Sequence, residues 1–494
     1  MSPEGSTGIA APLLNDPDLL RQQCYVNGHW IDGDAGSPLP VTDPATGETV
    51  ARVPQLSRAQ VRAAIDHAAA AWADWRGRTA KQRADVLRDW YRRILAAQDD
   101  FALLMTREQG KPLAEAKGEV AYGASFVEWF AEEGKRVHGD TIPTHAEGKR
   151  ILVTREPIGV TAAITPWNFP VAMITRKVAP ALAAGCPVVV KPAPQTPLCA
   201  LALAELAHRA GVPAGILNVV CGDEIAVGQE LSENPKVRKL SFTGSTEVGR
   251  ILMRQCADTV KNISLELGGN APFIVFDDAD LDAAVEGLMQ SKYRNSGQTC
   301  VCANRVYVQD GVYDAFTEKL VERVRDLKVG PGTEPDVAQG PLIDTAALEK
   351  VEAHIADATA KGAHIALGGE PDVRGGTFFQ PTVLTDVHGE MRLAREETFG
   401  PVAPLFRFHD DDEAVREAND TEYGLAAYFY SRDLGRVWRV SEALEYGMLG
   451  INTGHISTEV APFGGVKQSG IGREGSKYGI EAFLEMKYIC LSGL

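Results

Sequence analysis

The sequence lacks the features that mark membrane and nucleic-acid-binding proteins. No apolar run in its 494 residues approaches the ~20 residues needed to cross a bilayer, and the longest candidates are interrupted by Pro170, Pro180 and Pro187. Acidic residues outnumber basic residues, and the formal net charge is −16. A protein that binds nucleic-acid phosphates requires a basic face. We therefore expect neither a membrane nor a nucleic acid as a partner.

Cysteines are few and are not arranged as metal ligands. The eight cysteines form no CxxC pair and no Cys/His cluster, which indicates reduced thiols and predicts neither a zinc site nor a disulfide framework. Residues 1–23 contain no basic run followed by an apolar core, so we expect no signal peptide. These observations favour a cytoplasmic protein without a bound metal.

A regular strand–helix rhythm is present instead. Helices are expected after Ser57, after Thr79 and from Pro112 to about Arg136. Short β-branched runs, separated by helical stretches, then lie at 160–165, 187–190, 216–220, 240–243 and 263–267. This alternation predicts an α/β fold, with a parallel sheet covered on both faces and ligand sites at the carboxyl ends of its strands. A second α/β region begins near Ala271.

The usual Gly-x-Gly-x-x-Gly dinucleotide fingerprint is absent after these strands. The run 244–249 (Gly-Ser-Thr-Glu-Val-Gly) follows one strand and opens a helix, where backbone N–H groups could bind a pyrophosphate. A Gly-Ser pair before a helix is also common as a simple cap, so both interpretations stay open. Lys191 follows another strand and is either a phosphate-binding cation or a solvated surface lysine.

Three short segments carry candidate catalytic residues. Cys300 ends the loop-like run Asn-Ser-Gly-Gln-Thr-Cys, Asn168 lies in Pro-Trp-Asn-Phe-Pro, and Glu266 lies in Leu-Glu-Leu-Gly-Gly-Asn. A thiolate is a nucleophile, a carboxylate is a general base, and an amide N–H can hold an oxyanion. Each also has a structural interpretation: a buried thiol, a strand-end carboxylate and a turn cap.

Taken together, these segments resemble the aldehyde dehydrogenase superfamily. Further matches lie at 242–245, 396–401 and 462–465, so the resemblance spans about Ile31 to the C-terminus. It implies an aldehyde dehydrogenase-like α/β fold with a Rossmann-type cofactor domain, an α/β catalytic domain and a small β oligomerisation element. The expected segments are 1–137 and 158–266, 267–480, and 138–157 with 481–494, respectively. The third element implies a homo-oligomer, a dimer or a dimer of dimers.

The resemblance also implies roles for individual residues. Cys300 would attack the aldehyde carbonyl, Asn168 would help hold the oxyanion, and Glu266 would activate the water that releases the acid. The residues expected to bind the dinucleotide are Trp167, Lys191, Pro194, Gly244, Ser245, Gly249, Leu267, Glu397 and Phe399. NAD-preferring relatives often have Glu at the position of Pro194, and that carboxylate would repel a 2′-phosphate. We therefore expect NADP, with NAD as the alternative.

Two arginines indicate a substrate with a carboxylate at its far end. Arg176 lies two helical turns beyond Asn168, and Arg294 lies six residues before Cys300. Arginine binds carboxylates through a planar fork, although salt bridges to the abundant Asp and Glu would also explain both residues. The chain resembles the succinic-semialdehyde-oxidising branch of the superfamily, in which residues matching Arg176, Arg294 and Ser457 hold the substrate carboxylate.

Some alternatives remain open at this stage. His455 replaces the apolar residue expected there, and glutarate semialdehyde is a close alternative substrate because one CH₂ is discriminated by only about 10- to 200-fold. Cys302 could form a reversible disulfide with Cys300, or be a quiet buried thiol. A binding protein without activity would be expected to lack Cys300, Glu266 or Asn168, and a thiol hydrolase would not need the dinucleotide segments.

Overall fold

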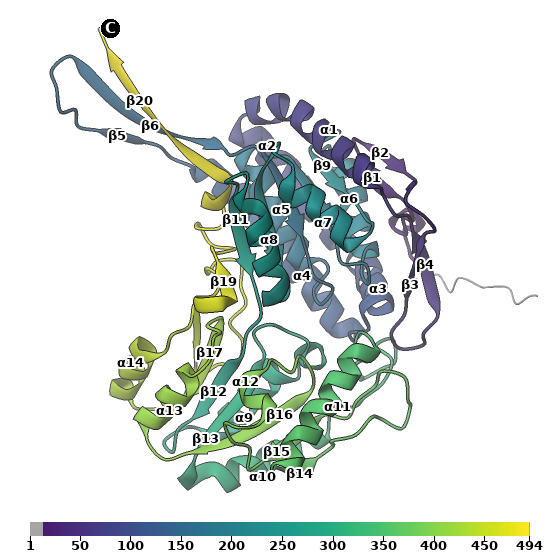
Figure 1. Ribbon diagram of the computed structural model, residues 1–494, viewed down its shortest axis with the longest axis vertical. Coiled ribbons are helices and arrows are strands. Elements are labelled where there is room, and N and C mark those ends of the chain that lie inside the picture. Colours follow the sequence, from purple (N-terminus) through teal and green to yellow (C-terminus); the bar gives the residue numbers. More distant parts are fainter. Residues whose placement is uncertain (1–12, 494) are drawn as a thin grey trace, which may run out of the picture.

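The fold consists of two sheets with their helices and a projecting arm (Figure 1). The computed structural model describes residues 13–493; residues 1–12 and Leu494, the outer ends of the predicted segments 1–137 and 481–494, lie outside the described part. The predicted α/β fold is confirmed. None of the helices within 13–493 is long and apolar enough to cross a bilayer.

The first sheet has the order β19-β11-β10-β7-β8-β9-β1-β2. Its five predicted strands are present and mutually parallel: β7 (Val160–Ile164), β8 (Val188–Lys191), β9 (Leu217–Val219), β10 (Val237–Thr243) and β11 (Asn262–Glu266). Antiparallel strands flank them: β1 (Cys24–Val26), β2 (His29–Ile31) and β19 (Gly470–Ile471). The pairing of β19 with β11 places a short stretch of the predicted catalytic segment 267–480 in the first sheet.

Local capping signals explain where the first helices begin. Both α1 (Arg58–Gly77) and α2 (Ala80–Ala96) start with a complete capping box, which is predicted at Thr79 and is also present at Ser57. The other helices around this sheet are α3 (Gln98–Gln109), α4 (Leu113–Glu133), α5 (Ala172–Ala184), α6 (Leu198–Arg209), α7 (Glu224–Glu233) and α8 (Thr246–Ala257). Every residue of α5 is buried, so this helix lies inside the domain and reaches the site described below.

The second sheet has the order β14-β15-β16-β13-β12-β17-β18 and is parallel except at β14. Its strands are β12 (Ala271–Val275), β13 (Ala303–Gln309), β14 (His364–Leu367), β15 (Thr382–Thr385), β16 (Val402–Phe408), β17 (Ala426–Tyr430) and β18 (Met448–Ile451). Phe273 and Ile274 pack into different hydrophobic clusters because successive side chains leave opposite faces of a strand. Helices α9 (Leu281–Lys292) and α10 (Tyr313–Arg325) cover one face, and α11 (Thr345–Ala360), α13 (Asp411–Asn419) and α14 (Leu434–Ala443) cover the other; the short α12 (Arg392–Arg395) precedes β16.

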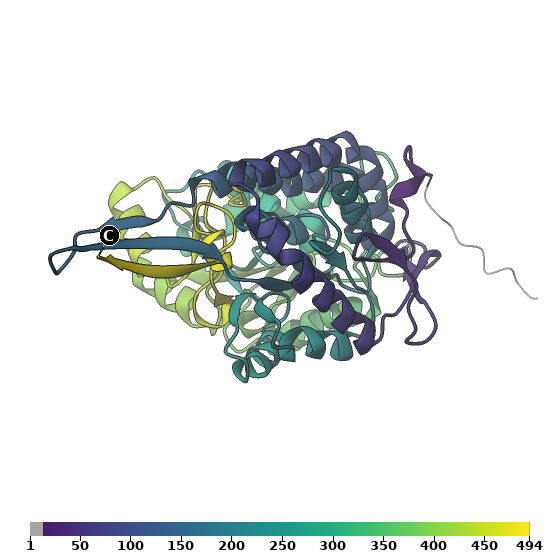
Figure 2. The same ribbon diagram turned by 90° about the horizontal axis from the view of Figure 1, so that it is seen from above.

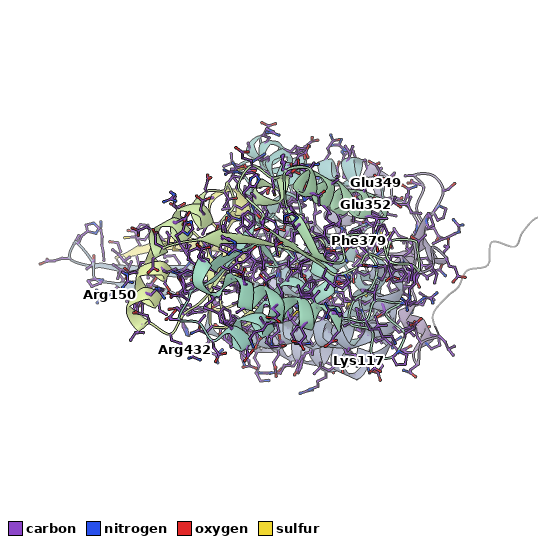
Figure 3. The ribbon with its side chains drawn as sticks, turned by 90° about the horizontal axis from the view of Figure 1, so that it is seen from below. Lys117, Arg150, Glu349, Glu352, Phe379 and Arg432 are labelled. Atoms are coloured by element: carbon purple, nitrogen blue, oxygen red, sulfur yellow. The ribbon has the colours of Figure 1, made fainter. Side chains whose placement is uncertain are left out.

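The arm is a three-stranded antiparallel sheet that extends away from both layers (Figures 1 and 2). It contains β5 (Asp140–Ile142), β6 (Lys149–Pro157) and β20 (Leu484–Ser492), with β6 in the middle. A separate hairpin pairs β3 (Leu39–Thr42) with β4 (Thr49–Val53). Charged side chains such as Lys117, Glu349 and Arg432 point outward around the body, whereas Phe379 is buried (Figure 3).

The connection between the sheets creates the site. The chain passes from β11 to β12 through residues 267–270, so the carboxyl edge of the first sheet faces the second sheet's domain. Asn168, Lys191, Gly244 and Glu266 lie at or just after strands of the first sheet. Cys300 precedes β13 of the second sheet. The candidate residues from both regions therefore meet at the junction.

Candidate active site

Cys300 follows a tight turn between α9 and β13. Asn295 and Ser296 have φ of 50° and 55°, and Gly297 has φ of 76°. Left-handed backbone costs of order 1–3 kcal/mol for each residue with a Cβ, so surrounding contacts must hold this turn. The Asn295 N–H donates to Glu115 (2.9 Å). At Gly297 a Cβ would lie 2.1 Å from the Gly400 carbonyl oxygen, which explains the glycine.

Asn168 is fixed from two sides next to this turn. Its side-chain Nδ2 donates to the Gln298 carbonyl (3.0 Å). Its own backbone carbonyl accepts from Lys111 Nζ (2.7 Å) and from Asn295 Nδ2 (3.1 Å). Asn168 and Cys300 line one cavity of about 380 Å³. The amide retains a second hydrogen that could donate to a ligand oxygen.

The Cys300 thiol is held in its protonated form. Burial raises its pKa to about 12, and the positive charge of Arg176 acts in the opposite direction. A thiol is a poor nucleophile compared with its thiolate. Reaction therefore requires a base, or a change in the charges around the sulfur.

Glu266 ends β11 and is the candidate base. Both of its carboxyl oxygens are buried without a hydrogen-bond partner. Burial is the main cause that raises its pKa above the usual carboxyl value, and the nearby Glu474 carboxylate adds to this effect, whereas Arg176 and Lys177 oppose it. A raised pKa makes the ionised carboxylate a stronger base.

Two adjoining cavities follow the carboxyl edge of the first sheet. The outer cavity, of about 420 Å³, is lined by Lys191, Gly244 and Ser245 among others. The inner cavity is the one of about 380 Å³ that contains Cys300. Both open beside the N-terminus of α8, which Ser245 caps by accepting the Val248 N–H (3.3 Å). The two spaces thus suit a ligand with two halves joined by a pyrophosphate.

The inner cavity contains four further predicted cofactor residues. They are Trp167, Leu267, Glu397 and Phe399. Burial raises the pKa of Glu397 to about 7, while its Oε1 accepts the Gly269 N–H (3.3 Å). The rings of Trp167 and Phe399 meet edge to face with centroids 5.6 Å apart.

Two predicted cofactor residues lie outside both cavities. Pro194 is half-buried beside the outer one, whose lining includes Ala193 and Gln195. Gly249 lies within α8, where a Cβ would approach Leu267 Cδ2 to 2.5 Å, so close packing favours glycine there; its contact with the cofactor stays a prediction. Sequence reasoning also missed Glu224, whose Oε1 lies 3.9 Å from Lys191 Nζ in the outer cavity.

The three predicted substrate residues meet at Cys300. Arg176, Arg294 and Ser457 line the same small enclosure as the cysteine. The two arginines differ, however. Arg176 is buried in an ion pair with Glu474, as the salt-bridge alternative predicts, and its role toward the substrate stays a prediction. Arg294 forms no hydrogen bond or ion pair through its guanidinium with any residue of 13–493, and it lies over the Phe169 ring at 4.8 Å.

Several buried charges next to the site carried no local sequence signal. Lys177, adjacent to Arg176 on α5, also pairs with Glu474, which lies 297 positions further along the chain. Lys111 pairs with Glu119 at 2.5 Å. A pairing between distant positions cannot be recognised from the pattern around either residue.

The structure also places Cys302, the cysteine predicted as a possible disulfide partner of Cys300. Cys302 is buried and its Sγ faces the Lys292 carbonyl at 3.6 Å, and all eight cysteines are free thiols. Its pairing with Cys300 stays a prediction. Across residues 13–493, no three His, Cys, Asp or Glu side chains are grouped so that they could hold a metal ion.

Comparison with known proteins identifies this arrangement. The family model described as "Aldehyde dehydrogenase family" matches residues 30–489. The chain belongs to the aldehyde dehydrogenase family. An aldehyde dehydrogenase named succinate-semialdehyde dehydrogenase [NADP(+)], from Escherichia coli (strain K12), is 65% identical over 478 residues, which cover 97% of this chain and 99% of the relative.

Two other relatives bear on the same site. A glutarate-semialdehyde dehydrogenase from Pseudomonas aeruginosa is 64% identical over 481 residues, covering 97% of this chain and all of the relative. The crystal structure of a succinate-semialdehyde dehydrogenase from Burkholderia pseudomallei superposes with a TM-score of 0.96 at 65% identity, covering 97% of this chain and 100% of that one. The aldehyde dehydrogenase fold predicted from the sequence is therefore confirmed over nearly the whole chain.

Proposed function

We propose that this aldehyde dehydrogenase oxidises succinic semialdehyde to succinate with NADP. The observation that carries the proposal is the unpaired guanidinium of Arg294, which lines the same enclosure as Cys300. A free guanidinium next to the nucleophile favours an aldehyde whose far end is a carboxylate. The relatives named for succinic semialdehyde and NADP support this choice.

In the first step, Cys300 attacks the aldehyde carbon. The proton of the Cys300 thiol passes to a base, for which Glu266 is the candidate. The positive charge of Arg176 favours the thiolate that remains. The carbonyl oxygen becomes an oxyanion that accepts from Asn168 Nδ2. Removing one such donor typically lowers kcat by about 10²- to 10³-fold, which is the loss expected for Asn168→Ala.

The cofactor would lie across the two cavities at the carboxyl edge. Lys191 and Ser245 would hold its adenosine side, and Trp167, Glu397 and Phe399 its nicotinamide side. When bound, NADP accepts the hydride that the Cys300 adduct expels. Glu266 would first pass the thiol proton to solvent and then remove a proton from water while the water oxygen attacks the thioester carbon and the C–S bond breaks, which returns the Cys300 sulfur. In sum, aldehyde and water become carboxylate and two protons while two electrons leave as hydride.

We further propose a cytoplasmic homo-oligomer, a dimer of dimers. The arm supports assembly because it exposes large apolar side chains, among them Met486 and Tyr488. The eight cysteines form no CxxC pair, which favours a reducing compartment.

Glutarate semialdehyde is the second candidate substrate, because a relative of nearly equal similarity is named for it. The deciding experiment compares initial rates of NADPH and NADH formation with succinic semialdehyde, glutarate semialdehyde and butanal. We expect kcat/KM to favour the carboxylated aldehydes, and Arg294→Ala to abolish that preference. Equal values for butanal and succinic semialdehyde would refute the carboxylate assignment.

A further inference from the structure

A buried histidine bridges two residues of the segment that contains Glu397 and Phe399. His354 lies on α11, and no part of its side chain is exposed. Its Nδ1 lies 3.1 Å from Thr398 Oγ1, and its Nε2 lies 3.2 Å from Glu396 Oε2. One imidazole ring therefore contacts the side chains on both sides of Glu397.

The chemistry of the two partners fixes the tautomer of this ring. Burial lowers the pKa of His354, although the hydrogen bond to Glu396 opposes this effect, so the imidazole is neutral at pH 7. Arg392 pairs with Glu396 at 2.9 Å and lowers the pKa of that carboxyl group, which is therefore ionised and can only accept. Nε2–H donates to Glu396, and Nδ1 accepts the hydroxyl hydrogen of Thr398. Both ring nitrogens are thus satisfied within the protein.

The backbone around Glu397 is held by a second set of contacts. The Thr398 N–H donates to Asn304 Oδ1 at 3.1 Å, and Asn304 Nδ2 donates to the Glu396 carbonyl at 3.1 Å. Glu396 has an extended backbone, with φ of −108° and ψ of 136°, and successive side chains leave an extended backbone on opposite sides. The Glu397 side chain therefore points away from the side chain of Glu396 and into the inner cavity, which it lines.

Phe399 shows why this segment needs to be held. Its φ is 56°, in the left-handed region, which costs free energy for a residue with a Cβ and persists only where the surroundings hold it. Its ring lines the inner cavity beside Trp167. Release of Thr398 would let this backbone relax and would move both Phe399 and Glu397.

We propose that His354 is a positioning residue that holds Glu397 and Phe399 in place for the nicotinamide half of NADP. The inference rests on the proposed function and deepens it. It requires no contact between the histidine and the cofactor, because the ring is buried and both of its nitrogens have partners. The adenosine half would lie in the outer cavity, whose lining in the described chain includes no residue of α11 or of 396–399.

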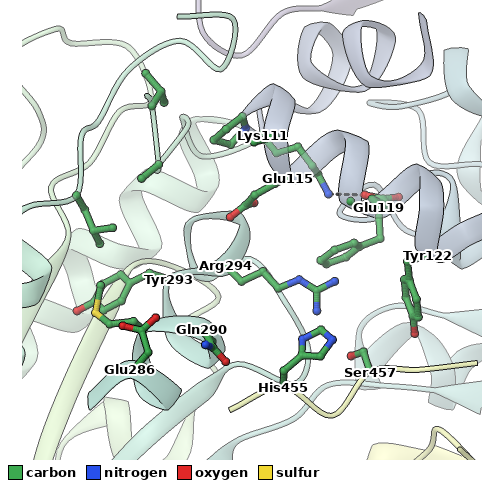
Figure 4. A pocket seen from close by; sticks show the side chains of 18 of the residues that line it. Lys111, Glu115, Glu119, Tyr122, Glu286, Gln290, Tyr293, Arg294, His455 and Ser457 are labelled. Carbon is green, nitrogen blue, oxygen red and sulfur yellow. Dashed lines mark hydrogen bonds and ion pairs between the residues drawn. The ribbon is translucent and has the colours of Figure 1, made fainter. Parts of the chain in front are cut away.

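The substrate side of the site is separate from these contacts. A cavity of about 670 Å³ adjoins the enclosure around Cys300, and its lining includes Glu115, Arg294 and His455 (Figure 4). Within residues 13–493, neither His354 nor the segment 396–399 contributes to that lining. Loss of the His354 contacts should therefore weaken the binding of NADP and leave the binding of the aldehyde unchanged.

The test measures the dissociation constants of NADP and of adenosine 2′,5′-bisphosphate, which is the adenosine half alone, by calorimetric titration without aldehyde. We expect His354→Leu to raise the constant for NADP about tenfold, because two hydrogen bonds are lost, and to leave the constant for adenosine 2′,5′-bisphosphate within about twofold. The single-turnover rate of hydride transfer should fall as well. KM for succinic semialdehyde, measured at saturating NADP, should not change.

Two conservative variants separate hydrogen bonding from packing. His354→Gln retains an amide donor for Glu396, and His354→Asn retains an acceptor for Thr398, so each should recover part of the loss. Thr398→Val keeps the histidine and removes its hydroxyl partner, so it provides the test if the substitutions on α11 prevent folding. The matched control is His67→Leu, which removes an exposed histidine from α1 that lines neither the outer nor the inner cavity and should change neither constant.

The outcomes separate this inference from the proposed function. An unchanged dissociation constant for NADP in His354→Leu would overturn the inference. An equal rise for NADP and adenosine 2′,5′-bisphosphate would overturn it too, because the substitution would then disturb the whole site, and so would equal losses in all three variants of His354. A wild type that fails to prefer succinic semialdehyde over butanal would instead refute the proposed substrate. The binding constants contain no aldehyde and would still decide the role of His354.

Discussion

At the scale of single residues, buried charge controls the chemistry near Cys300. Glu474 is buried between Arg176 and Lys177, and these cations lower its pKa although burial acts to raise it. Glu266 has no such partner, and its pKa is raised. One carboxylate is thus kept ionised while its neighbour is kept ready to take a proton.

The first prediction concerns pH. Because the Glu266 pKa is raised, the fraction in the ionised, basic form grows only as pH rises through that raised value. Glu474→Gln removes a negative neighbour and leaves two cations, so both changes favour the ionised form. We expect the acid limb of the thioester hydrolysis rate, measured in single turnovers, to move to lower pH.

The same substitution should also destabilise the protein. Two buried cations without their counter-ion cost about 3–5 kcal/mol, measured by thermal or denaturant unfolding. Glu352→Gln on the exposed face of α11 is the control for loss of a carboxylate. An acid limb that stays in place or moves to higher pH would show that Glu474 does not act on Glu266.

The second prediction concerns cofactor choice. Glu224 is 66% exposed and its carboxylate lies 3.9 Å from Lys191 Nζ, so it competes with a 2′-phosphate for that cation. Two unit charges about 4 Å apart interact by about 1 kcal/mol in water, which corresponds to a factor of about five in affinity. We expect Glu224→Gln to lower KM for NADP by about that factor and to leave KM for NAD within about twofold. A parallel change for both cofactors would contradict this explanation.

At the scale of elements, a buried ion pair connects α4 to the segment that contains Asn168. Glu119 on α4 pairs with Lys111 and accepts the N–H groups of Val171 and Ala172, at 2.9 and 3.2 Å, where α5 begins. Lys111 in turn donates to the Asn168 carbonyl. The position of the Asn168 amide, which we propose holds the oxyanion, therefore depends on the packing of two helices.

The third prediction tests that connection. Lys111→Met alone leaves a buried carboxylate unpaired and should cost about 3–5 kcal/mol of unfolding free energy. The double variant Lys111→Met with Glu119→Gln removes both charges, so much of that stability should return. We nevertheless expect kcat of the double variant to stay about tenfold low, with KM for NADP unchanged, because Asn168 loses a donor that positions it.

The exposed pair Lys81–Asp85, at 2.8 Å, provides the matched control for this double variant. Its neutralisation should change neither kcat nor stability measurably, because exposed pairs contribute about 0–1 kcal/mol. Wild-type kcat in the Lys111/Glu119 double variant would show that the pair has no effect on Asn168.

Elements with local signals could be predicted from the sequence. The apolar stripe after Ser57 and the capping box at Thr79 predicted the starts of α1 and α2, and β-branched runs predicted the five parallel strands. Helix α3 was missed because only Ala97 separates it from α2 and no side chain caps it. Strands β1 to β4 were missed because the strand prediction rested on β-branched runs that alternate with helices, and these four strands precede the first α-helix.

Part of the candidate site could also be predicted, because some of its residues lie in local sequence motifs. Cys300, Asn168 and Glu266 lie in contiguous motifs, and the structure brings them to one junction. The partnership of Glu474 with α5 joins positions 297 residues apart, and the unequal states of Arg176 and Arg294 depend on it. Such information appears only once the chain is folded.

At the scale of the whole molecule, the arm presents exposed apolar side chains and an unpaired strand edge. Met486 and Tyr488 on β20 are 67% and 60% exposed, and both lie on the strand whose outer edge is unpaired within the described chain. Unpaired strand edges and exposed apolar side chains favour association with another sheet. A second copy of this chain is the partner we propose.

The fourth prediction follows from this arm. Replacing both Met486 and Tyr488 by Asp should yield monomers or dimers in light scattering, because charged side chains would be buried at the interface. Val373→Asp changes an apolar residue that is 94% exposed elsewhere and should leave the assembly intact. An unchanged oligomeric mass in the double variant would show that subunits associate through another surface.

The return of the chain to the first sheet at β19 also constrains the order in which the protein is completed during synthesis. When a ribosome has made residues up to Glu266, the five central strands exist, but β19 and Glu474 do not. Arg176 and Lys177 of the fully buried helix α5 must then wait for their counter-ion until some two hundred further residues have emerged. A nascent or truncated chain ending before Glu474 therefore holds an unfinished domain with two uncompensated charges, an open target for chaperones and proteases.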